Sequence, residues 1–186
     1  MGTRHLTIVR LDGEYKIAQY GQFDGYPAGQ GMTALAFARK LSDPDIKRRF
    51  VENVRKCSWI TQVELDEISM DDDWRNIHPE LSRDTGADIL QMVYDSDNGL
   101  SLWNRIEFAA NSLFCEWAWL IDLDFDTFEG YKGFNDDSPL SIEDRFYYLR
   151  DKEHGAYHAI KMKALWDLNS LPSDEEFLAE FNTNEE

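Results

Sequence analysis

Cysteine is scarce in this chain of 186 residues, which contains only Cys57 and Cys115. Two cysteines are too few for a disulfide framework, and we expect both thiols to stay reduced. Long apolar runs are missing as well: the longest, near residues 117–121, has the length of a strand, so the sequence predicts no segment that spans a bilayer. The first residues show no apolar signal-peptide core, and we therefore expect a cytoplasmic protein.

Basic residues are the second shortage. The chain has 19 Lys and Arg against 36 Asp and Glu, which gives a net charge of −17. This charge repels phosphate backbones and anionic lipids, so we expect no direct nucleic-acid binding and no membrane partner. The apolar fraction of 42% and the aromatic fraction of 13% are sufficient for a sizeable core. We expect one globular domain over residues 1–181 and a flexible tail over 182–186.

The order of the expected elements is that of an α+β fold. Two alternating segments, 4–11 and 14–21, flank Asp12-Gly13, a dipeptide typical of tight hairpins because both residues tolerate positive φ. Further along the chain the sequence predicts helices over 32–41, 44–56, 59–70 and 81–94, strands over 114–123, 127–132 and 157–168, and a short last helix. We therefore expect a single domain whose antiparallel or mixed sheet is built from two hairpins, with helices packed against it.

Two of these helices carry recognisable start signals. Asp43 precedes Pro44 and is predicted to be the N-cap of the second helix, because proline is favoured at the first helical position. Ser173 and Glu176 have the spacing of a capping box at the start of the last helix.

The segment from Gln19 to Gly31 is the most unusual stretch of the chain. Within 13 residues it holds three amides, one carboxylate, two phenols and four glycines, and it ends where a helix is predicted to begin. Glycines let a backbone approach a ligand, and a helix start favours an anionic group. The predicted ligand-binding residues are Gln19, Gln22, Asp24, Tyr26 and Gln30, together with Arg4 on the adjoining strand. The alternative is a rigid turn whose polar side chains satisfy buried backbone groups.

Catalysis by this segment is left open by the sequence. Asp24 or His5 would be the general base of any hydrolysis, whereas a protein that only sequesters its ligand needs no such group. The glycine spacing matches neither the phosphate-binding loop of nucleoside triphosphatases nor the dinucleotide fingerprint, so both are excluded.

Cys115 is a candidate nucleophile, because a thiol beside a base such as His5 or a cation such as Arg4 can form a thiolate. The alternative is a small core residue, since Cys115 lies among Phe, Trp and Leu.

Signals for a metal ion are incomplete, and the sequence implies no metal and no cofactor. His154 and His158 lack further ligands, and the alternating Asp122, Asp124 and Asp126 lack the later glycine and glutamate of a calcium loop. A solvated turn is the expectation for the three aspartates.

An acidic cluster allows a different class of function. It comprises Glu64, Asp66, Glu67 and the run Asp71–Asp73. Carboxylates on a rigid body can imitate the phosphates of DNA and occupy a nucleic-acid-binding protein. The alternative hypothesis is thus an acidic protein-interaction module that inhibits a basic host protein. The non-functional alternative is that these carboxylates form a solvated face that favours solubility.

Several motifs together carry a resemblance to a family. They are GTRH at residues 2–5, AQYGQFDGYP at 18–27 followed by GQG at 29–31, SLFCEW at 112–117, IDLD at 121–124, YKGFN at 131–135 and RF at 145–146. The chain resembles an uncharacterised protein family of bacteriophages, bacteria and filamentous fungi, with Phe23 where tryptophan is more usual. The resemblance implies no activity; a phage origin would imply a role in host takeover or counter-defence. The leading hypothesis is binding of a small polar or nucleotide-like ligand by the segment 19–31.

Overall fold

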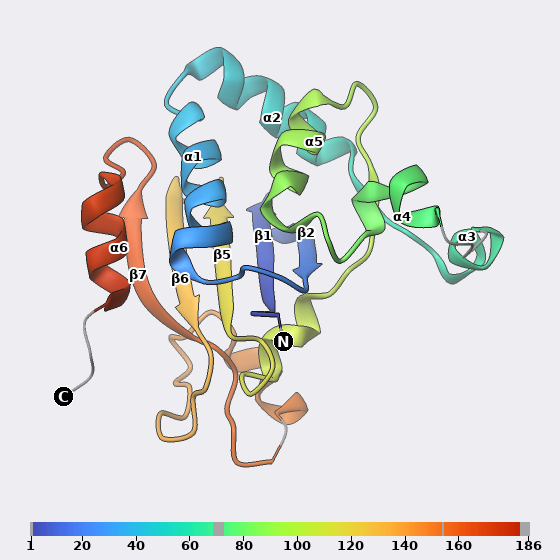
Figure 1. Cartoon of the computed structure of the whole chain (residues 1–186). Coiled ribbons are helices and arrows are strands. Elements are labelled where there is room, and N and C mark those ends of the chain that lie inside the picture. Colours follow the sequence, from blue (N-terminus) through green and yellow to red (C-terminus); the bar gives the residue numbers. More distant parts are fainter. Residues whose placement is uncertain (1, 69–72, 154, 183–186) are drawn as a thin grey trace.

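The computed structural model describes residues 2–68, 73–153 and 155–182 of the chain (Figure 1). The strands are β1 (His5–Leu11), β2 (Glu14–Gly21), β3 (Ser58–Trp59), β4 (Ser101–Leu102), β5 (Trp117–Asp122), β6 (Thr127–Lys132) and β7 (Lys161–Asp167). The helices are α1 (Met32–Lys40), α2 (Pro44–Lys56), α3 (Gln62–Glu67), α4 (Trp74–Ile77), α5 (Ile89–Asp95) and α6 (Asp174–Asn182). This composition confirms the predicted α+β class.

A mixed sheet of five strands, in the order β2-β1-β5-β6-β7, forms the centre of the fold. Both expected hairpins are present: β1 pairs with β2, β5 pairs with β6, and both pairs are antiparallel. At the first turn Asp12 and Gly13 have φ values of 55° and 79°, as the dipeptide predicted. The two hairpins join through β1 and β5, which run parallel, and this makes the sheet mixed.

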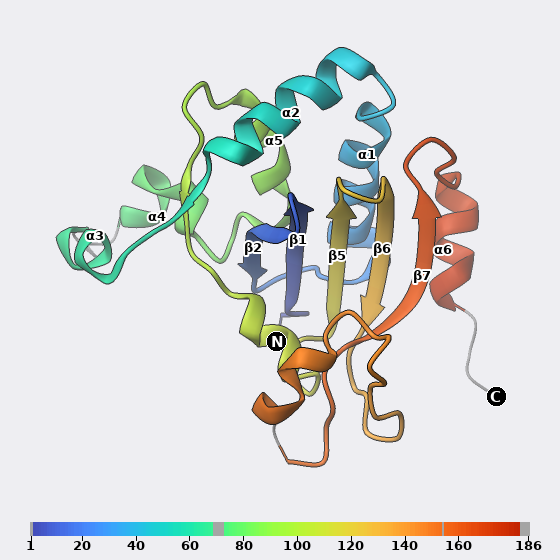
Figure 2. The same ribbon diagram turned by 180° about the vertical axis from the view of Figure 1, so that it is seen from behind.

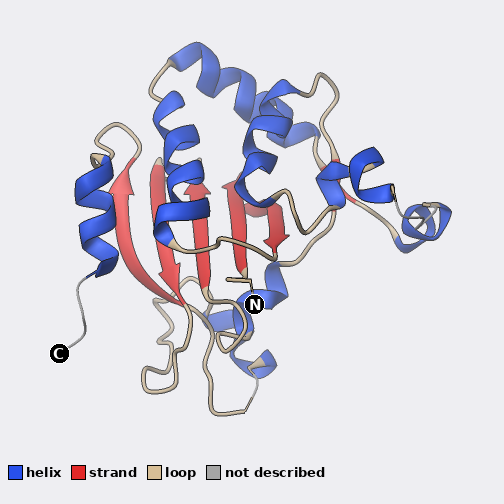
Figure 3. Cartoon of the chain, viewed as in Figure 1, coloured by secondary structure: helices blue, strands red, loops and turns tan. Residues whose placement is uncertain are grey.

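The two faces of the sheet are covered differently. Helices α1 and α5 lie in front of the strands in Figure 1 and behind them in Figure 2, α2 crosses the upper end of the sheet, and α6 lies beside β7. The core on that side contains Trp119 and Phe128 of the sheet, packed with Phe50 and Phe177 of the helices. Short 3-10 helices and loops cover the other face, where residues 106–110 and 147–152 pack on the sheet. Figure 3 shows loops and short helices at one end of the strands.

Both predicted helix caps are confirmed. Asp43 accepts hydrogen bonds from the backbone N–H groups of Asp45 and Ile46 at 2.8 and 3.2 Å, and α2 starts at Pro44. Ser173 and Glu176 exchange the reciprocal bonds of a capping box at the start of α6.

The middle of the chain differs most from the sequence prediction. The helix expected over 59–70 is wrong at its start: Trp59 belongs to β3, which pairs with β4, and α3 begins only after Thr61, which caps it. The helix expected over 81–94 begins at Ile89, because Gly86 has a φ of +53° that a right-handed helix does not accommodate.

The strand and tail boundaries shift by a few residues. β5 begins at Trp117 rather than at 114, and β7 begins at Lys161 rather than at 157. Helix α6 includes Asn182, the first residue of the expected tail, and residues 183–186 lie outside the described part of the chain.

A side arm leaves the body next to β2, an edge strand of the sheet. It consists of the small β3–β4 sheet with α3 and α4, and both views show α3 and α4 projecting beyond β2 (Figures 1 and 2). The arm and the edge strand together position the candidate site.

Candidate functional site

The glycines of the segment 19–31 make room for side chains of the protein itself. A Cβ atom at Gly21 would collide with the imidazole of His5, and one at Gly25 would lie 2.7 Å from the Cβ of His5. At Gly31 a Cβ atom would lie 2.7 Å from the indole of Trp119. At these three positions the missing side chain allows the segment to pack closely on the sheet, and the close approach of this backbone to a ligand stays a prediction.

The three glutamine side chains of the segment bond to the protein itself: those of Gln19 and Gln30 hold residues 82–87, and that of Gln22 bonds within the segment. Gln19 Nε2 donates to the carbonyl of Ser82 at 2.7 Å, and Gln30 Oε1 accepts from the N–H of Ala87 at 2.7 Å. Gln22 Oε1 accepts from the hydroxyl of Tyr20 at 2.5 Å. These contacts match the alternative interpretation, in which the amides satisfy groups of the protein, and they fix the segment 82–87 against the edge of the sheet.

Asp24 and Tyr26 lie apart from this network. Both side chains are exposed, and within the described residues neither makes a hydrogen bond through its side chain. Asp24 has a φ of 56°, and its carbonyl accepts from the N–H of Gln30 at 2.8 Å, so its evident role is in the turn. Neither residue lines the pocket described below.

The side chains of His5 and Arg4 also contact other parts of the protein and do not line the pocket described below. The His5 side chain is fully buried, and burial lowers its pKa to about 4, against a smaller opposing effect of the Thr3 backbone. A buried neutral imidazole has no access to an external substrate, so its environment does not suit a general base. Arg4 lies 3.8 Å from a carboxylate oxygen of Glu116 and 4.5 Å above the ring of Phe114.

Cys115 has the surroundings of a core residue. The side chain is completely buried, and burial raises the pKa of the thiol well above its usual range, with Glu116 adding to the effect. Because the thiolate is the nucleophilic form, this environment opposes the catalytic interpretation.

The three alternating aspartates of the β5–β6 hairpin differ in exposure: Asp122 is buried, Asp124 is exposed, and Asp126 is partly exposed and pairs with Lys47. Asp122 is fully buried, 2.8 Å from Arg145 and 3.3 Å from Arg10, which corrects the expectation of a solvated turn. Asp124 accepts from the backbone of residues 12 and 13 and ties the two hairpins together. In the described residues no group of three or more His, Cys, Asp or Glu is placed to hold a metal ion; His154 lies outside them.

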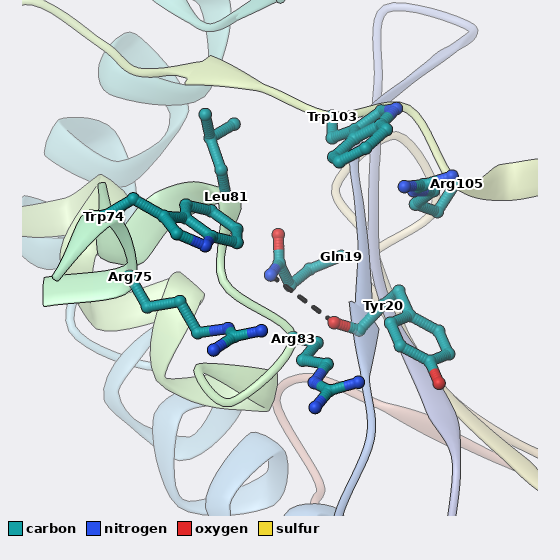
Figure 4. A pocket seen from close by; sticks show the side chains of 8 residues that line it. All are labelled: Gln19, Tyr20, Trp74, Arg75, Leu81, Arg83, Trp103 and Arg105. Atoms are coloured by element: carbon teal, nitrogen blue, oxygen red, sulfur yellow. Dashed lines mark hydrogen bonds between the residues drawn. The ribbon is translucent and has the colours of Figure 1, made fainter. Parts of the chain in front are cut away.

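The strongest candidate site is a pocket of about 180 Å³ between the edge strand β2 and the side arm. We refer to it as the Arg/Trp pocket. Its lining residues are Gln19, Tyr20, Trp74, Arg75, Leu81, Arg83, Trp103 and Arg105. Figure 4 shows Trp74 and Arg75 on one side, Trp103 and Arg105 on the other, and Arg83 below them. Of the predicted ligand-binding residues, only Gln19 lines this pocket.

Backbone hydrogen bonds attach the segments of Arg83 and Arg105 to β2 and to the residue that follows it. The N–H of Gln22 donates to the carbonyl of Arg83 at 2.9 Å, and the N–H of Arg105 donates to the carbonyl of Ala18 at 3.2 Å. The two bonds lie on either side of Tyr20 along the strand. An edge strand has unpaired N–H and C=O groups, and here those groups anchor the two segments that carry Arg83 and Arg105.

Charge in the pocket is strongly positive for so acidic a protein. Arg75 and Arg83 share one carboxylate, that of Asp84, at 3.8 and 4.0 Å. Arg105 has no ion pair within the described part of the chain. The pocket is thus lined by three guanidinium groups, of which two are paired with a single carboxylate, and this leaves an excess of positive charge for an anionic ligand.

Aromatic rings support two of these guanidinium groups. The Arg105 guanidinium lies 3.4 Å above the ring of Trp103, and that of Arg75 lies 5.2 Å from the ring of Trp74. Burial lowers the pKa of Arg105, and the nearby Tyr20 opposes this effect. A partly desolvated guanidinium fixed on an aromatic face loses little freedom when it binds an anion.

Sequence reasoning missed Trp74, Arg75, Arg83, Trp103 and Arg105. A signal was present, since both of these tryptophans stand one or two residues before an arginine in a chain with far fewer basic than acidic residues. The exposed α3 carries Glu64, Asp66 and Glu67 of the acidic cluster, whereas Asp71 and Asp72 lie outside the described residues.

Comparisons with known proteins give no further assignment. No protein-family model matches the chain, and neither a curated protein nor a solved structure matches it. In the described residues no helix has the length and apolar character needed to cross a membrane.

Proposed function

We propose that the protein binds a small nucleotide-like anion in the Arg/Trp pocket. The observation that carries the proposal is the convergence of Arg75, Arg83 and Arg105 with two tryptophans in a chain of net charge −17. One guanidinium group can donate two parallel hydrogen bonds to the oxygens of one phosphate, and indole rings stack on nucleobases. This ligand class is the one predicted from the sequence, but its contacts come from the side arm rather than from the turn at Asp24.

The segment 19–31 has a supporting role in this proposal. Gln19 and Gln30 fix the backbone of residues 82–87, and Gln22 anchors Arg83 through its N–H group. The pocket is lined by three arginines, one amide and three aromatic side chains, and this set supports the binding of an anion.

Calorimetric titration with the four ribonucleoside 5′-monophosphates tests the proposal. We expect at least one of them to bind tenfold more tightly than its nucleoside and than inorganic phosphate, because the phosphate and base sites act together. Arg105→Gln should weaken that binding at least tenfold, and higher ionic strength should weaken it further. Arg48→Gln is the matched control, because Arg48 is an exposed arginine on α2.

Two results would contradict the proposal. One is that no monophosphate binds more tightly than its nucleoside. The other is that Arg105→Gln and Arg48→Gln bind equally well.

The acidic interaction module is a second candidate, favoured by one observation on the side arm. Helix α3 has no buried residue, so Glu64, Asp66 and Glu67 are presented to solvent. Replacing these three by Gln should abolish the salt-sensitive capture of a basic host protein; binding that persists after the replacement would exclude this function. The host-takeover or counter-defence role implied by the family resemblance, and the cytoplasmic location, stay predictions.

A further inference from the structure

A second cavity adjoins the Arg/Trp pocket. It has a volume of about 560 Å³ and shares Tyr20 and Arg105 with the first. Its other walls include Asn104, Phe108, Asn111 and Lys152. Because both side chains line both cavities, Arg105 stands at their junction, and a group that binds this guanidinium is within reach of either side.

The second cavity is lined by an aromatic ring and by a residue whose amide oxygen has no hydrogen-bond partner. The ring of Phe108 packs edge-on against Tyr20 at 5.1 Å. The side-chain oxygen of Asn111 is buried and has no hydrogen-bond partner within the described residues. A buried acceptor without a partner is costly, and a donor from a ligand would relieve that cost.

The charges of the second cavity balance except at the junction. Lys152 forms an ion pair with Glu107, and Asn104 is neutral. The unpaired positive charge is that of Arg105, at the boundary with the Arg/Trp pocket. The second cavity therefore suits a neutral aromatic group with hydrogen-bond donors, such as a nucleobase, rather than a second phosphate.

We propose that the ligand is a dinucleotide unit, with its phosphodiester bound at Arg105, one base beside Trp74 and Trp103, and the other beside Phe108 and Asn111. This inference rests on the proposed function and specifies its ligand. In a dinucleotide, one negatively charged phosphodiester lies between two aromatic bases. The two cavities offer the matching order, with aromatic side chains on either side of the Arg105 guanidinium.

The charge of the protein restricts the length of the ligand. Phosphates beyond the two cavities would face a chain with 36 acidic and 19 basic residues, and each would be repelled. The same dinucleotide unit could be a free molecule or the end of a single strand, and the repulsion favours the free molecule.

Calorimetry with three probes tests the inference: adenosine 5′-monophosphate, the linear dinucleotide ApA, which has one phosphodiester and no terminal phosphate, and a single-stranded deoxyadenosine decamer. The series is repeated with the base found best for the monophosphates. We expect the dinucleotide to bind at least tenfold more tightly than the monophosphate, and the decamer to bind no more tightly than the dinucleotide. Asn111→Ala and Phe108→Leu should reduce dinucleotide affinity to the level of the monophosphate while leaving monophosphate binding unchanged. Phe134→Leu, at an exposed ring elsewhere on the surface, is the control.

The possible failures are distinguishable. Equal affinity for monophosphate and dinucleotide would overturn the dinucleotide inference and leave the proposed function intact. A decamer that binds tenfold more tightly than the dinucleotide would overturn the preference for a free short ligand. Absence of binding to every probe would overturn both proposals.

Discussion

The indole Nε1 of Trp119 donates a hydrogen bond of 3.0 Å to the carbonyl of Gly25. The bond joins the centre of β5 to the turn that follows β2, 94 residues earlier in the chain. The same indole packs against Gly31. The glycine-rich segment and the SLFCEW segment with the strand that follows it are therefore parts of one packed unit, and their unusual composition has a structural cause.

Gly21→Ala should be strongly destabilising for this reason. The new methyl group would collide with the buried His5 ring, and overpacking of this kind costs about 2 kcal/mol of unfolding free energy. Urea denaturation measures the loss. In a His5→Ala background the space is free, so the same substitution should cost less than about 1 kcal/mol there. An equal cost in both backgrounds would show that the ring contact is not the cause.

The elements that could be predicted from the sequence are those that local chemistry determines. The Asp12-Gly13 turn, the Asp43 cap and the Ser173 capping box each depend on residues within three or four positions of one another. The helix expected over 81–94 begins only at Ile89, because Gly86 packs against the side chain of Gln30 with a φ of 53° that a right-handed helix does not accommodate.

The candidate site could not be predicted in the same way. Its lining residues come from β2, α4, the loop at Arg83 and the segment after β4, and they meet through long-range backbone bonds to the edge of β2. The net charge of −17 also gives no sign that three arginines line one pocket. The side chains of the three glutamines that the sequence singles out have partners within the chain, and these partners are distant in sequence for Gln19 and Gln30.

His5 gives a prediction about pH. Its folded pKa of about 4 lies below the unfolded value of about 6.5, so its contribution to stability is complete above pH 6.5. As the pH falls from 6.5 to 4, only the unfolded chain gains a proton at this site, and up to about 3 kcal/mol of stability is lost. The NMR signal of the His5 ring, assigned with His5→Asn, should stay constant from pH 7 to pH 5. A midpoint above pH 6 would contradict the burial argument.

Arg145 should be essential for stability. It contacts the buried carboxylates of Asp122 and Glu129, and Arg145→Met would leave both without their shared cation. Breaking such a buried pair costs about 3–5 kcal/mol, measured by chemical denaturation. Arg150→Met, at an exposed arginine, should cost less than about 0.5 kcal/mol. Equal effects of the two changes would argue against the buried network.

The thiols should react slowly with Ellman's reagent in the folded protein. Burial raises the pKa of both Cys57 and Cys115, and Cys115 is the more deeply buried. In a Cys57→Ser variant the remaining thiol should react at the rate of global unfolding, and at once in guanidinium chloride. Rapid labelling of the native variant would contradict this prediction and would support Cys115 as a nucleophile.

Gln30 should control the Arg/Trp pocket without touching it. Its Oε1 accepts the N–H of Ala87, and Gln30→Met removes this acceptor while keeping a side chain of similar length. Hydrogen exchange at Ala87 should then accelerate by tenfold or more, because a bonded amide exchanges only when the bond opens. Affinity for the best nucleoside monophosphate should fall, since the backbone that carries Arg83 is held by the same contacts.

Gln30→Glu keeps an acceptor and should restore slow exchange, whereas Asp24→Ala combined with Gln22→Ala should leave exchange at Ala87 unchanged. If Gln30→Met altered affinity but not exchange, a direct ligand contact would have to replace the positioning role argued for this glutamine.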